Sequence, residues 1–503
     1  MTIYNINLGI GWASSGVEYA QAYRATLFRK LGLAAKFIFT DFITGENIQH
    51  LTQNMGFKDD EVIWLYSFFT DIPITATSVT LADVKTGLIY PIQREERLGK
   101  VFRYFNDDMD FFMTCYCNDE TSHLVQRVEY VSRGILIRKD YFTSTRLFSE
   151  YYAPKDGKAT VYLRRFFNQD GSVAYEENVD GVESIFRFKQ AIYDDKSQLL
   201  KEMLARLQLS KNDLLILDRS TGIGQTIFQE RGAAKLAVVI HAEHFSPQSV
   251  TKDTILWNNF YEYQFTNADK VDAFICATAG QSQLLAEQFK TYQACEPRIV
   301  TIAVGSLPAC SYPQKARKPF SLVTASRLAP EKHVDWLIKA VIKAKQLLPE
   351  LSLDIYGTGG EEAKLRELIQ KHQAQDYIRL LGHKQMAERY QAYEVYLAGS
   401  TSEGFGLTLM EAVGSGLALI GLDVRYGNQT FIKDGQNGYL IPRKEPDDSK
   451  VMVEAFAKKI LDLYTKADLA AFSQKSYQIA SSFLEAAVIQ DWHDFLKEVV
   501  GND

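Results

Sequence analysis

Two glutamates that stand eight residues apart have the spacing and surroundings of a ligand site. Residues 402–412 read SEGFGLTLMEA and directly follow an apolar run, Val395–Ala398. That run predicts a buried parallel strand, and ligands of parallel sheets lie beyond the carboxyl ends of the strands. Glu403 would leave the strand into a glycine turn, and Glu411 would lie about one turn inside the following helix. Both carboxylates could accept hydrogen bonds from vicinal hydroxyls.

The turn between these glutamates suits a phosphate. Gly404 and Gly406 let the backbone approach a ligand closely, and the helix is predicted to begin near Gly406. Amide groups in the first turn of a helix lack carbonyl partners and form its positive end. Those expected to face the ligand belong to Phe405, Leu407 and Thr408. An ordinary helix dipole would also favour nearby carboxylates, which is the alternative interpretation.

A basic pair follows the strand predicted at residues 320–324. Arg327 and Lys332 lie in the sequence SRLAPEK, at the same edge of the sheet as Glu403. A forked guanidinium and a compact ammonium can together hold a diphosphate and neutralise it as it leaves. An isolated pair of this kind is usually only solvated surface, so its position beside the glutamates carries the inference.

Glycine turns end two further strands predicted in this half of the chain. Gly357 follows the strand at 353–356, and Gly382 with His383 follows the strand at 378–381. We expect these turns to admit a nucleotide base and its ribose, although a single glycine pair is more often just a tight turn.

The N-terminal half supplies two more candidates. Gly16 opens the first predicted helix after a glycine-rich loop, but the G-x-G-x-x-G spacing of dinucleotide sites is absent. His241 follows the apolar run Leu236–Ile240 and could contact a sugar. The sequence HAEH lacks the HExxH pattern of zinc enzymes, so we expect no metal site.

The elements that must position these residues form two α/β series. Strands and helices alternate over residues 1–42 and from 196 onward, and a proline-containing linker near 307–319 separates two halves. From about 75 to 188, short alternating runs are divided by turn sequences at roughly ten-residue spacing, as expected for an antiparallel meander. We therefore predict an α/β protein with two Rossmann-like domains facing a cleft and a β-rich insertion in the first.

Composition excludes several classes of function. The chain has 503 residues and a net charge of −6, which argues against broad binding to nucleic acid. No signal peptide and no apolar run long enough to span a membrane is present in the sequence. The five scattered cysteines are typical of a reduced compartment, so we expect a cytoplasmic protein, with peripheral membrane contact left open.

These residues together resemble the family-4 retaining glycosyltransferases of the two-Rossmann (GT-B) type. Glu403 and Glu411 match the family's E-x7-E pair, and Gly16 matches its N-terminal G-G-V-E turn, in which Ser15 replaces the first glycine. The expected division is residues 1–45 and 196–306 for the acceptor-side domain, 46–195 for the insertion, 307–484 for the nucleotide-sugar domain, and 485–503 for a terminal helix.

The insertion narrows the resemblance to the catalytic subunits of the two-subunit transferases of the bacterial accessory secretion system. That resemblance implies transfer of N-acetylglucosamine (GlcNAc) from UDP-GlcNAc to Ser or Thr of serine-rich repeat adhesins before export, with a partner subunit and no metal cofactor. Alternatives are the same fold acting on a lipid, glucan or small molecule, or a non-catalytic binding subunit, which should have lost the Glu or the Arg/Lys pair.

The resemblance also implies a role for each site residue. Glu403 and His241 would hold the donor sugar, Glu411 the ribose, and the turn at Gly382 and His383 the uracil. Arg327, Lys332 and the helix amides would stabilise the charge on the departing UDP.

Overall fold

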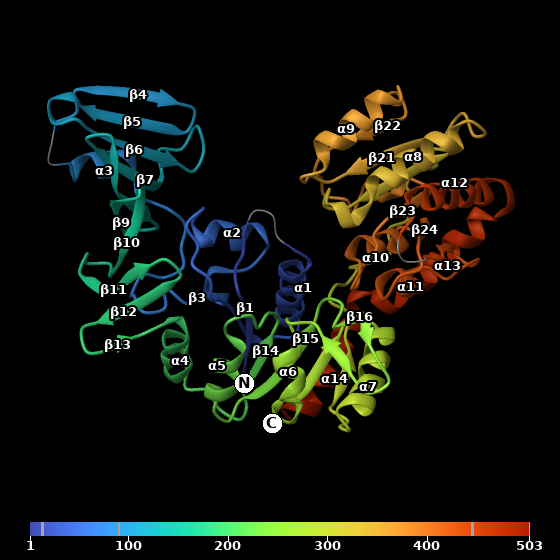
Figure 1. Cartoon of the computed structure of the whole chain (residues 1–503), viewed down its shortest axis with the longest axis horizontal. Helices are drawn as coiled ribbons and strands as arrows, with labels where there is room; N and C mark the ends of the chain where they lie inside the picture. Colours follow the sequence, from blue (N-terminus) through green and yellow to red (C-terminus); the bar gives the residue numbers. More distant parts are fainter. Residues whose placement is uncertain (12–14, 89–90, 444–446, 502–503) are drawn as a thin grey trace. The chain divides into compact units, whose positions relative to one another are not determined.

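The computed structural model describes residues 1–11, 15–88, 91–443 and 447–501 (Figure 1). The chain forms two compact units, one of residues 1–237 and 263–271 and the other of residues 238–262 and 272–503. The boundary falls within strand β15 rather than at the predicted linker. The loop that follows β15 packs closely against loops of the C-terminal half, since a Cβ on Gly404 would lie 2.5 Å from the carbonyl oxygen of His241.

The first sheet has seven strands in the order β19-β18-β15-β14-β1-β2-β3. Its central strands are continuous apolar runs and are buried along their length, as expected for a parallel sheet. The strands are β1 (Thr2–Asn7), β2 (Ala34–Phe39), β3 (Val62–Trp64), β14 (Leu214–Leu217), β15 (Lys235–Ile240), β18 (Ala273–Cys276) and β19 (Ile299–Thr301). The helices of this region are α1 (Gly16–Lys30), α2 (Ile48–Asn54), α4 (Lys196–Leu207), α5 (Gly224–Glu230), α6 (Glu262–Thr266) and α7 (Ala279–Tyr292).

The insertion is one ten-stranded sheet whose strands pair in the order of the sequence, which confirms the antiparallel meander. It consists of β4 (Arg94–Leu98), β5 (Val101–Asn106), β6 (Phe111–Cys117), β7 (Val125–Ser132), β8 (Ile135–Phe142), β9 (Arg146–Lys155), β10 (Lys158–Phe167), β11 (Val173–Asp180), β12 (Glu183–Phe188) and β13 (Ile192–Tyr193), with helix α3 (Leu81–Thr86) beside it. The expected start at residue 46 is too early. β3 pairs in parallel with β2, so residues 62–64 belong to the first sheet.

The second parallel sheet has six strands in the order β22-β21-β20-β23-β24-β25. These are β20 (Ser321–Ala325), β21 (Ser352–Tyr356), β22 (Ile378–Leu380), β23 (Val395–Ala398), β24 (Ala418–Leu422) and β25 (Gly438–Ile441). β21 and β23 pair with opposite sides of β20, so the later strands are added outward from β20 in two opposite directions. Ligand sites of α/β sheets lie at such switch points, beyond the carboxyl ends of the strands.

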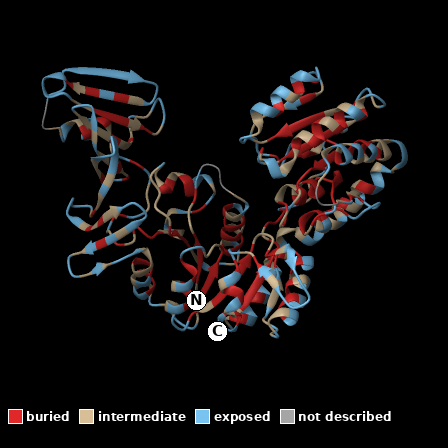
Figure 2. Ribbon diagram, viewed as in Figure 1, coloured by how far each residue is buried: buried red, intermediate tan, exposed pale blue. Residues whose placement is uncertain are grey.

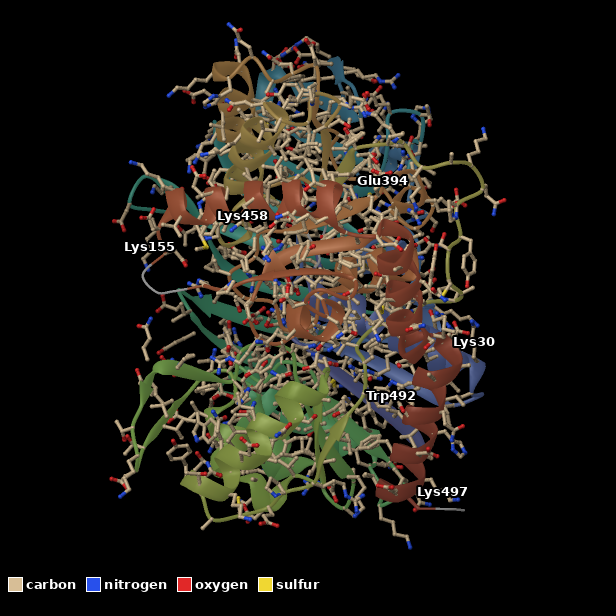
Figure 3. All side chains as sticks on the ribbon, turned by 90° about the vertical axis from the view of Figure 1, so that its right-hand side faces the viewer. Lys30, Lys155, Glu394, Lys458, Trp492 and Lys497 are labelled. Carbon is tan, nitrogen blue, oxygen red and sulfur yellow. The ribbon has the colours of Figure 1, made fainter. Side chains whose placement is uncertain are left out.

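The helices that follow β20 in the sequence are α8 (Val334–Lys345), α9 (Glu362–Lys371), α10 (Leu407–Gly414), α11 (Gly427–Phe431), α12 (Ser449–Lys466), α13 (Leu469–Ala480) and α14 (Glu485–Val499). A two-stranded hairpin, β16 (Phe245–Val250) with β17 (Ile255–Trp257), was not anticipated from the sequence. Lys458 on α12 is exposed, whereas Trp492 on α14 is 3% exposed (Figure 3). Among the described residues no helix has the length and apolar character needed to cross a membrane.

Burial follows this architecture (Figure 2). The central strands of the two parallel sheets, such as β14, β18, β20, β23 and β24, are buried, whereas β4 at the edge of the insertion is exposed at each of its five residues. The second sheet packs its apolar side chains with α8 and α12 into one core, which includes Leu337, Val341, Leu353, Ile420, Phe456 and Ile460. The loops at the carboxyl ends of these strands are therefore carried by a rigid base.

Candidate active site

Lys332 and Glu403 meet at the carboxyl ends of two paired strands. Lys332 ends the short 3-10 turn after β20, and its ammonium donates to Glu403 Oε2 over 2.7 Å. Both side chains are partly exposed, at 16% and 22%. The two loops are also joined through the backbone, because the amide of Thr401 donates to the carbonyl of Glu331. The structure thus brings together a cation and a carboxylate that the sequence assigned to one ligand.

The glycine turn after Glu403 is closely packed. Gly406 has a φ of +89°, in the left-handed region that favours glycine. A Cβ there would lie 2.6 Å from Leu409 Cδ1. Helix α10 begins one residue later, as predicted, with Gly406 as its N-cap. A ligand at this turn would meet main-chain amides, without a side chain in the way.

The predicted amide donors divide into two kinds. Leu407 and Thr408 form the first turn of α10, and the Thr408 hydroxyl oxygen accepts a hydrogen bond from Tyr396 at 2.8 Å. The side chain of Phe405 is buried and packs against Phe431 and Phe483. Phe405 therefore contributes a main-chain amide to the site and an aromatic ring to the core.

Glu411 lies in a different electrostatic environment from Glu403. It is partly buried on α10, and burial raises the pKa of its carboxyl group to about 7, while a hydrogen bond with Tyr390 opposes this shift. Desolvation disfavours the charged form of a carboxyl group. A ligand hydroxyl that donates to the carboxylate would favour ionisation, so Glu411 is suited to bind a diol such as ribose.

The glycine turn at residue 357 packs against the loop that carries Arg327. A Cβ on Gly357 would lie 1.8 Å from the carbonyl oxygen of Ser326, and one on Gly359 would lie 2.4 Å from that of Leu328. The amide of Gly357 also donates to the carbonyl of Gly382 over 2.9 Å. Three strand-end loops are thereby fixed against one another, and the close approach requires glycine at positions 357 and 359.

Two predicted residues of this sheet do not contact the glutamates. Arg327 is 64% exposed and pairs with Glu331, at 3.2 Å between Nη2 and Oε1. His383 is exposed beyond β22. Arg327 and Lys332 thus share a loop but hold different carboxylates in the structure, so their joint grip on a diphosphate stays a prediction.

His241 lies in the loop after β15, which the second compact unit includes. Its amide and that of Ala242 both donate to the Tyr261 hydroxyl oxygen, each over 3.0 Å. The close approach of Gly404 to the His241 carbonyl places these two predicted residues side by side. Sequence reasoning missed Glu243 and Tyr426, whose hydroxyl group lies 2.5 Å from Glu243 Oε1.

Gly16 belongs to the other compact unit and is exposed at the start of α1. Ser15 is the N-cap of this helix and forms a capping box with Glu18, so serine at the position of the family's glycine starts the helix well. Arg219, which follows β14, donates to the Ser15 hydroxyl over 2.7 Å and was not anticipated. The predicted loop before Gly16 includes residues 12–14, which lie outside the described residues.

In the described part of the chain, no group of three or more His, Cys, Asp or Glu side chains is arranged to hold a metal ion. Lys332 and the start of α10 lie beside Glu403, and Arg327 lies in the same loop as Lys332.

The second sheet is a doubly wound parallel sheet that carries Glu403, Lys332 and the N-terminus of α10 at its switch point. Residues 312–471 match the family "Glycosyl transferases group 1", and residues 94–190 match the "GtfA extended beta-sheet domain". TarM, at 18% identity, shares the fold over 98% of each chain with a TM-score of 0.68. The fold and the site define a glycosyltransferase of the GT-B class.

Closer relatives extend over the whole chain. The "UDP-N-acetylglucosamine--peptide N-acetylglucosaminyltransferase GtfA subunit" of Streptococcus agalactiae is 55% identical, covering 100% of this chain and 99% of its own. The solved pneumococcal O-GlcNAc transferase GtfA, in complex with UDP and GlcNAc, is 56% identical over 100% and 99%, with a TM-score of 0.96. The GtfA/B complex matches with a TM-score of 0.93 and 55% identity. The chain belongs to the GtfA subunit family.

Proposed function

We propose that this enzyme transfers GlcNAc from UDP-GlcNAc to Ser or Thr hydroxyls of a serine-rich repeat adhesin before export, with retention of the anomeric configuration. The observation that carries the proposal is the Lys332–Glu403 contact of 2.7 Å beside the first turn of α10. Full-length identity of 55% to a peptide N-acetylglucosaminyltransferase subunit supports the donor and the peptide acceptor.

The proposal assigns a role to each site residue. The uracil lies at the turn of Gly382 and His383, and its ribose donates to Glu411. Lys332, Arg327 and the amides of α10 neutralise the diphosphate as its bond to the sugar stretches. Glu403 accepts from sugar hydroxyls, and His241 contacts the same sugar.

In the proposed mechanism retention arises because the acceptor hydroxyl attacks on the face that UDP leaves. The leaving phosphate oxygen takes the acceptor's proton while the new glycosidic bond forms, so no covalent enzyme intermediate is needed. The protein holds the two reactants and stabilises charge, which are the two largest contributions available without a nucleophile.

The insertion is the surface for a large acceptor or a partner subunit. A sheet of ten strands has two exposed edges, and exposed edges pair with other chains unless they are blocked. The solved GtfA/B complex supports a GtfB-like partner for this chain. The proposed location is the cytoplasm, with peripheral contact at the inner face of the membrane.

The direct test is transfer to a Ser/Thr-rich peptide with UDP-GlcNAc, UDP-glucose, UDP-GalNAc and GDP-mannose as donors. We expect transfer from UDP-GlcNAc and an α-linked product by NMR, because the donor is α-linked. Product with the inverted configuration would overturn the mechanism. Transfer only to a lipid, glucan or small molecule would replace the acceptor, and failure to bind any donor would indicate a non-catalytic subunit.

A further inference from the structure

Tyr426 connects two loops that carry predicted site residues. It follows β24 and is 3% exposed. One of these loops is the glycine turn that begins at Glu403, and the other is the loop of residues 241–244 after β15. All of these residues belong to the second compact unit.

The main chain next to Tyr426 fixes Glu403. The amides of Tyr426 and Gly427 both donate to the Glu403 carbonyl oxygen, each over 2.8 Å. A Cβ on Gly427 would lie 2.1 Å from the carbonyl oxygen of Phe405, so the two backbones are in direct contact. A shift of Tyr426 would therefore move the backbone of Glu403.

The side chain of Tyr426 holds the other loop. Its hydroxyl group lies 2.5 Å from Glu243 Oε1 and 3.2 Å from His244 Nδ1. Its ring stacks on the His244 ring, with centroids 6.0 Å apart and an interplanar angle of 18°. Arg425 Nε lies 3.8 Å from the second oxygen of Glu243.

His244 also fixes the position of the Tyr426 hydroxyl group. Its side chain is fully buried, and Nε2 lies 2.7 Å from Gln288 Oε1. Burial lowers the pKa of His244 to about 4, so the ring is neutral at pH 7. Burial, together with Glu243, raises the pKa of Tyr426, which therefore keeps its proton. The hydroxyl is a permanent donor to Glu243, two residues from His241.

We propose that Tyr426 is a positioning residue: through its main chain and its bond to Glu243, it fixes Glu403 relative to His241. The inference rests on the proposed function, in which both residues hold the donor sugar. Misplacing two groups around a reacting bond lowers the rate of the chemical step more than ground-state binding. Glu411 and the turns at Gly357 and Gly382, which the proposed function assigns to the nucleotide, are not in this network.

The test is Tyr426→Phe, which removes the hydroxyl group and keeps the ring. We expect kcat for peptide transfer to fall about 10- to 100-fold, while the Kd for UDP stays within about twofold. Glu243→Ala should have the same effect, and Glu243→Gln, which retains an oxygen acceptor, should lose less. The double variant Tyr426→Phe/Glu243→Ala should be no slower than the slower single variant, since both remove one interaction.

Tyr175→Phe is the matched control. The Tyr175 hydroxyl is buried in the insertion and donates to the Tyr66 carbonyl over 2.6 Å. Its loss should lower Tm comparably and leave the kcat for UDP-GlcNAc hydrolysis, which needs no acceptor, unchanged, whereas Tyr426→Phe should lower that kcat too. Parental kcat in Tyr426→Phe, additive losses in the double variant, or equal losses of kcat and UDP affinity would overturn the positioning role. A parent enzyme without GlcNAc transfer would instead contradict the proposed function.

Discussion

The second parallel sheet and the ten-stranded insertion differ in where their functional side chains lie. In the parallel sheet the central strands are buried, and β23 reads as a continuous apolar run, so the predicted site residues lie in loops and in helix α10 beyond the strand ends. In the insertion, β12 alternates exposed and buried residues along its length. A parallel sheet concentrates its chemistry at the ends of its strands, whereas an exposed antiparallel sheet distributes it over a face and two edges.

The charged side chains of the insertion are also arranged differently from those of the parallel sheet. The arginines of the insertion lie over aromatic rings within the sheet, at 3.7 Å from the Phe105 centroid for Arg94 and 4.1 Å from the Tyr130 centroid for Arg138. Arg164 bonds Glu150 and Glu177. These contacts are internal to the sheet and stabilise it. Catalytic chemistry is therefore expected at the parallel sheet, and recognition of another chain at the insertion.

Removing the charge of Glu403 should have the largest effect, and it tests whether catalysis takes place at the parallel sheet. Glu403→Gln should lower kcat by about 100- to 1,000-fold, because the carboxylate acts where positive charge develops on the sugar. The Lys332 contact is partly exposed and contributes at most about 1 kcal/mol to folding, so Tm should change little. Steady-state kinetics and melting curves measure both. Parental kcat in this variant would show that residues 403–411 only begin a helix and have no catalytic role.

Glu411 predicts a pH dependence of nucleotide binding. The pKa of its carboxyl group is raised to about 7, and the ribose favours the ionised form, so affinity is lost as pH falls through 7. UDP should bind about tenfold more weakly at pH 6 than at pH 8 if only the ionised form binds. Calorimetry at both values measures this change. Glu411→Gln retains the titration of UDP itself but should lack the additional tenfold change, and identical pH profiles would exclude the role.

The burial of Glu411 also predicts how the free energy of unfolding depends on pH. Stability should fall as pH rises, whereas UDP affinity should increase. A raised carboxyl pKa stabilises the fold below it, and this contribution is lost as pH rises from about 4.5 through 7. At pH 8 the buried carboxylate is charged, so Glu411→Gln should be more stable than the parent by about 1–3 kcal/mol. Urea unfolding of the ligand-free proteins measures the difference, and a destabilised variant at pH 8 would show that the carboxylate has a compensating partner.

The insertion should affect only the protein acceptor. Leu98, at the end of the edge strand, is 83% exposed, and Val182, in the turn between β11 and β12, is fully exposed. The double variant Leu98→Glu/Val182→Glu should keep its Tm and its rate of UDP-GlcNAc hydrolysis. Glycosylation of the full acceptor protein should fall roughly tenfold, equivalent to about 1.4 kcal/mol of docking energy. Unchanged glycosylation would show that neither Leu98 nor Val182 belongs to the surface that docks the acceptor protein.

The smallest expected effect is that of a chelator. Lys332, Arg327 and the amides of α10 supply positive charge at the proposed diphosphate site. Transfer should therefore continue at its parental rate in excess EDTA. A rate that collapses with EDTA and returns with Mn²⁺ would mean that the diphosphate is bound through a metal ion.

The sequence predicted features that depend on local patterns. Buried parallel strands are apolar runs, so β15, β20, β21 and β23 were placed within one or two residues. The helix start near Gly406 followed from its glycines and the preceding strand. β3 has only three residues and lies beside β2, which explains why the insertion was predicted to begin too early.

Contacts between distant loops could not be predicted in this way. Tyr426 and Glu243 are separated by 183 residues, and neither belongs to a recognisable motif. Each follows a strand that the sequence did predict, so searching every strand end for polar side chains would have found them. The pairing of Arg327 with Glu331, rather than with the glutamate site, depends on side-chain geometry that composition does not encode.

Titration of UDP into Glu403→Gln and Glu411→Gln tests the central claim most directly. UDP lacks the sugar, so Glu403→Gln should bind it with an affinity within about twofold of the parent. Glu411→Gln loses one or two charge-assisted hydrogen bonds to the ribose, each about 1.5–3 kcal/mol, so its Kd should rise at least tenfold at pH 8. Parental UDP affinity in both variants would contradict the assignment of this helix start as the nucleotide-sugar site.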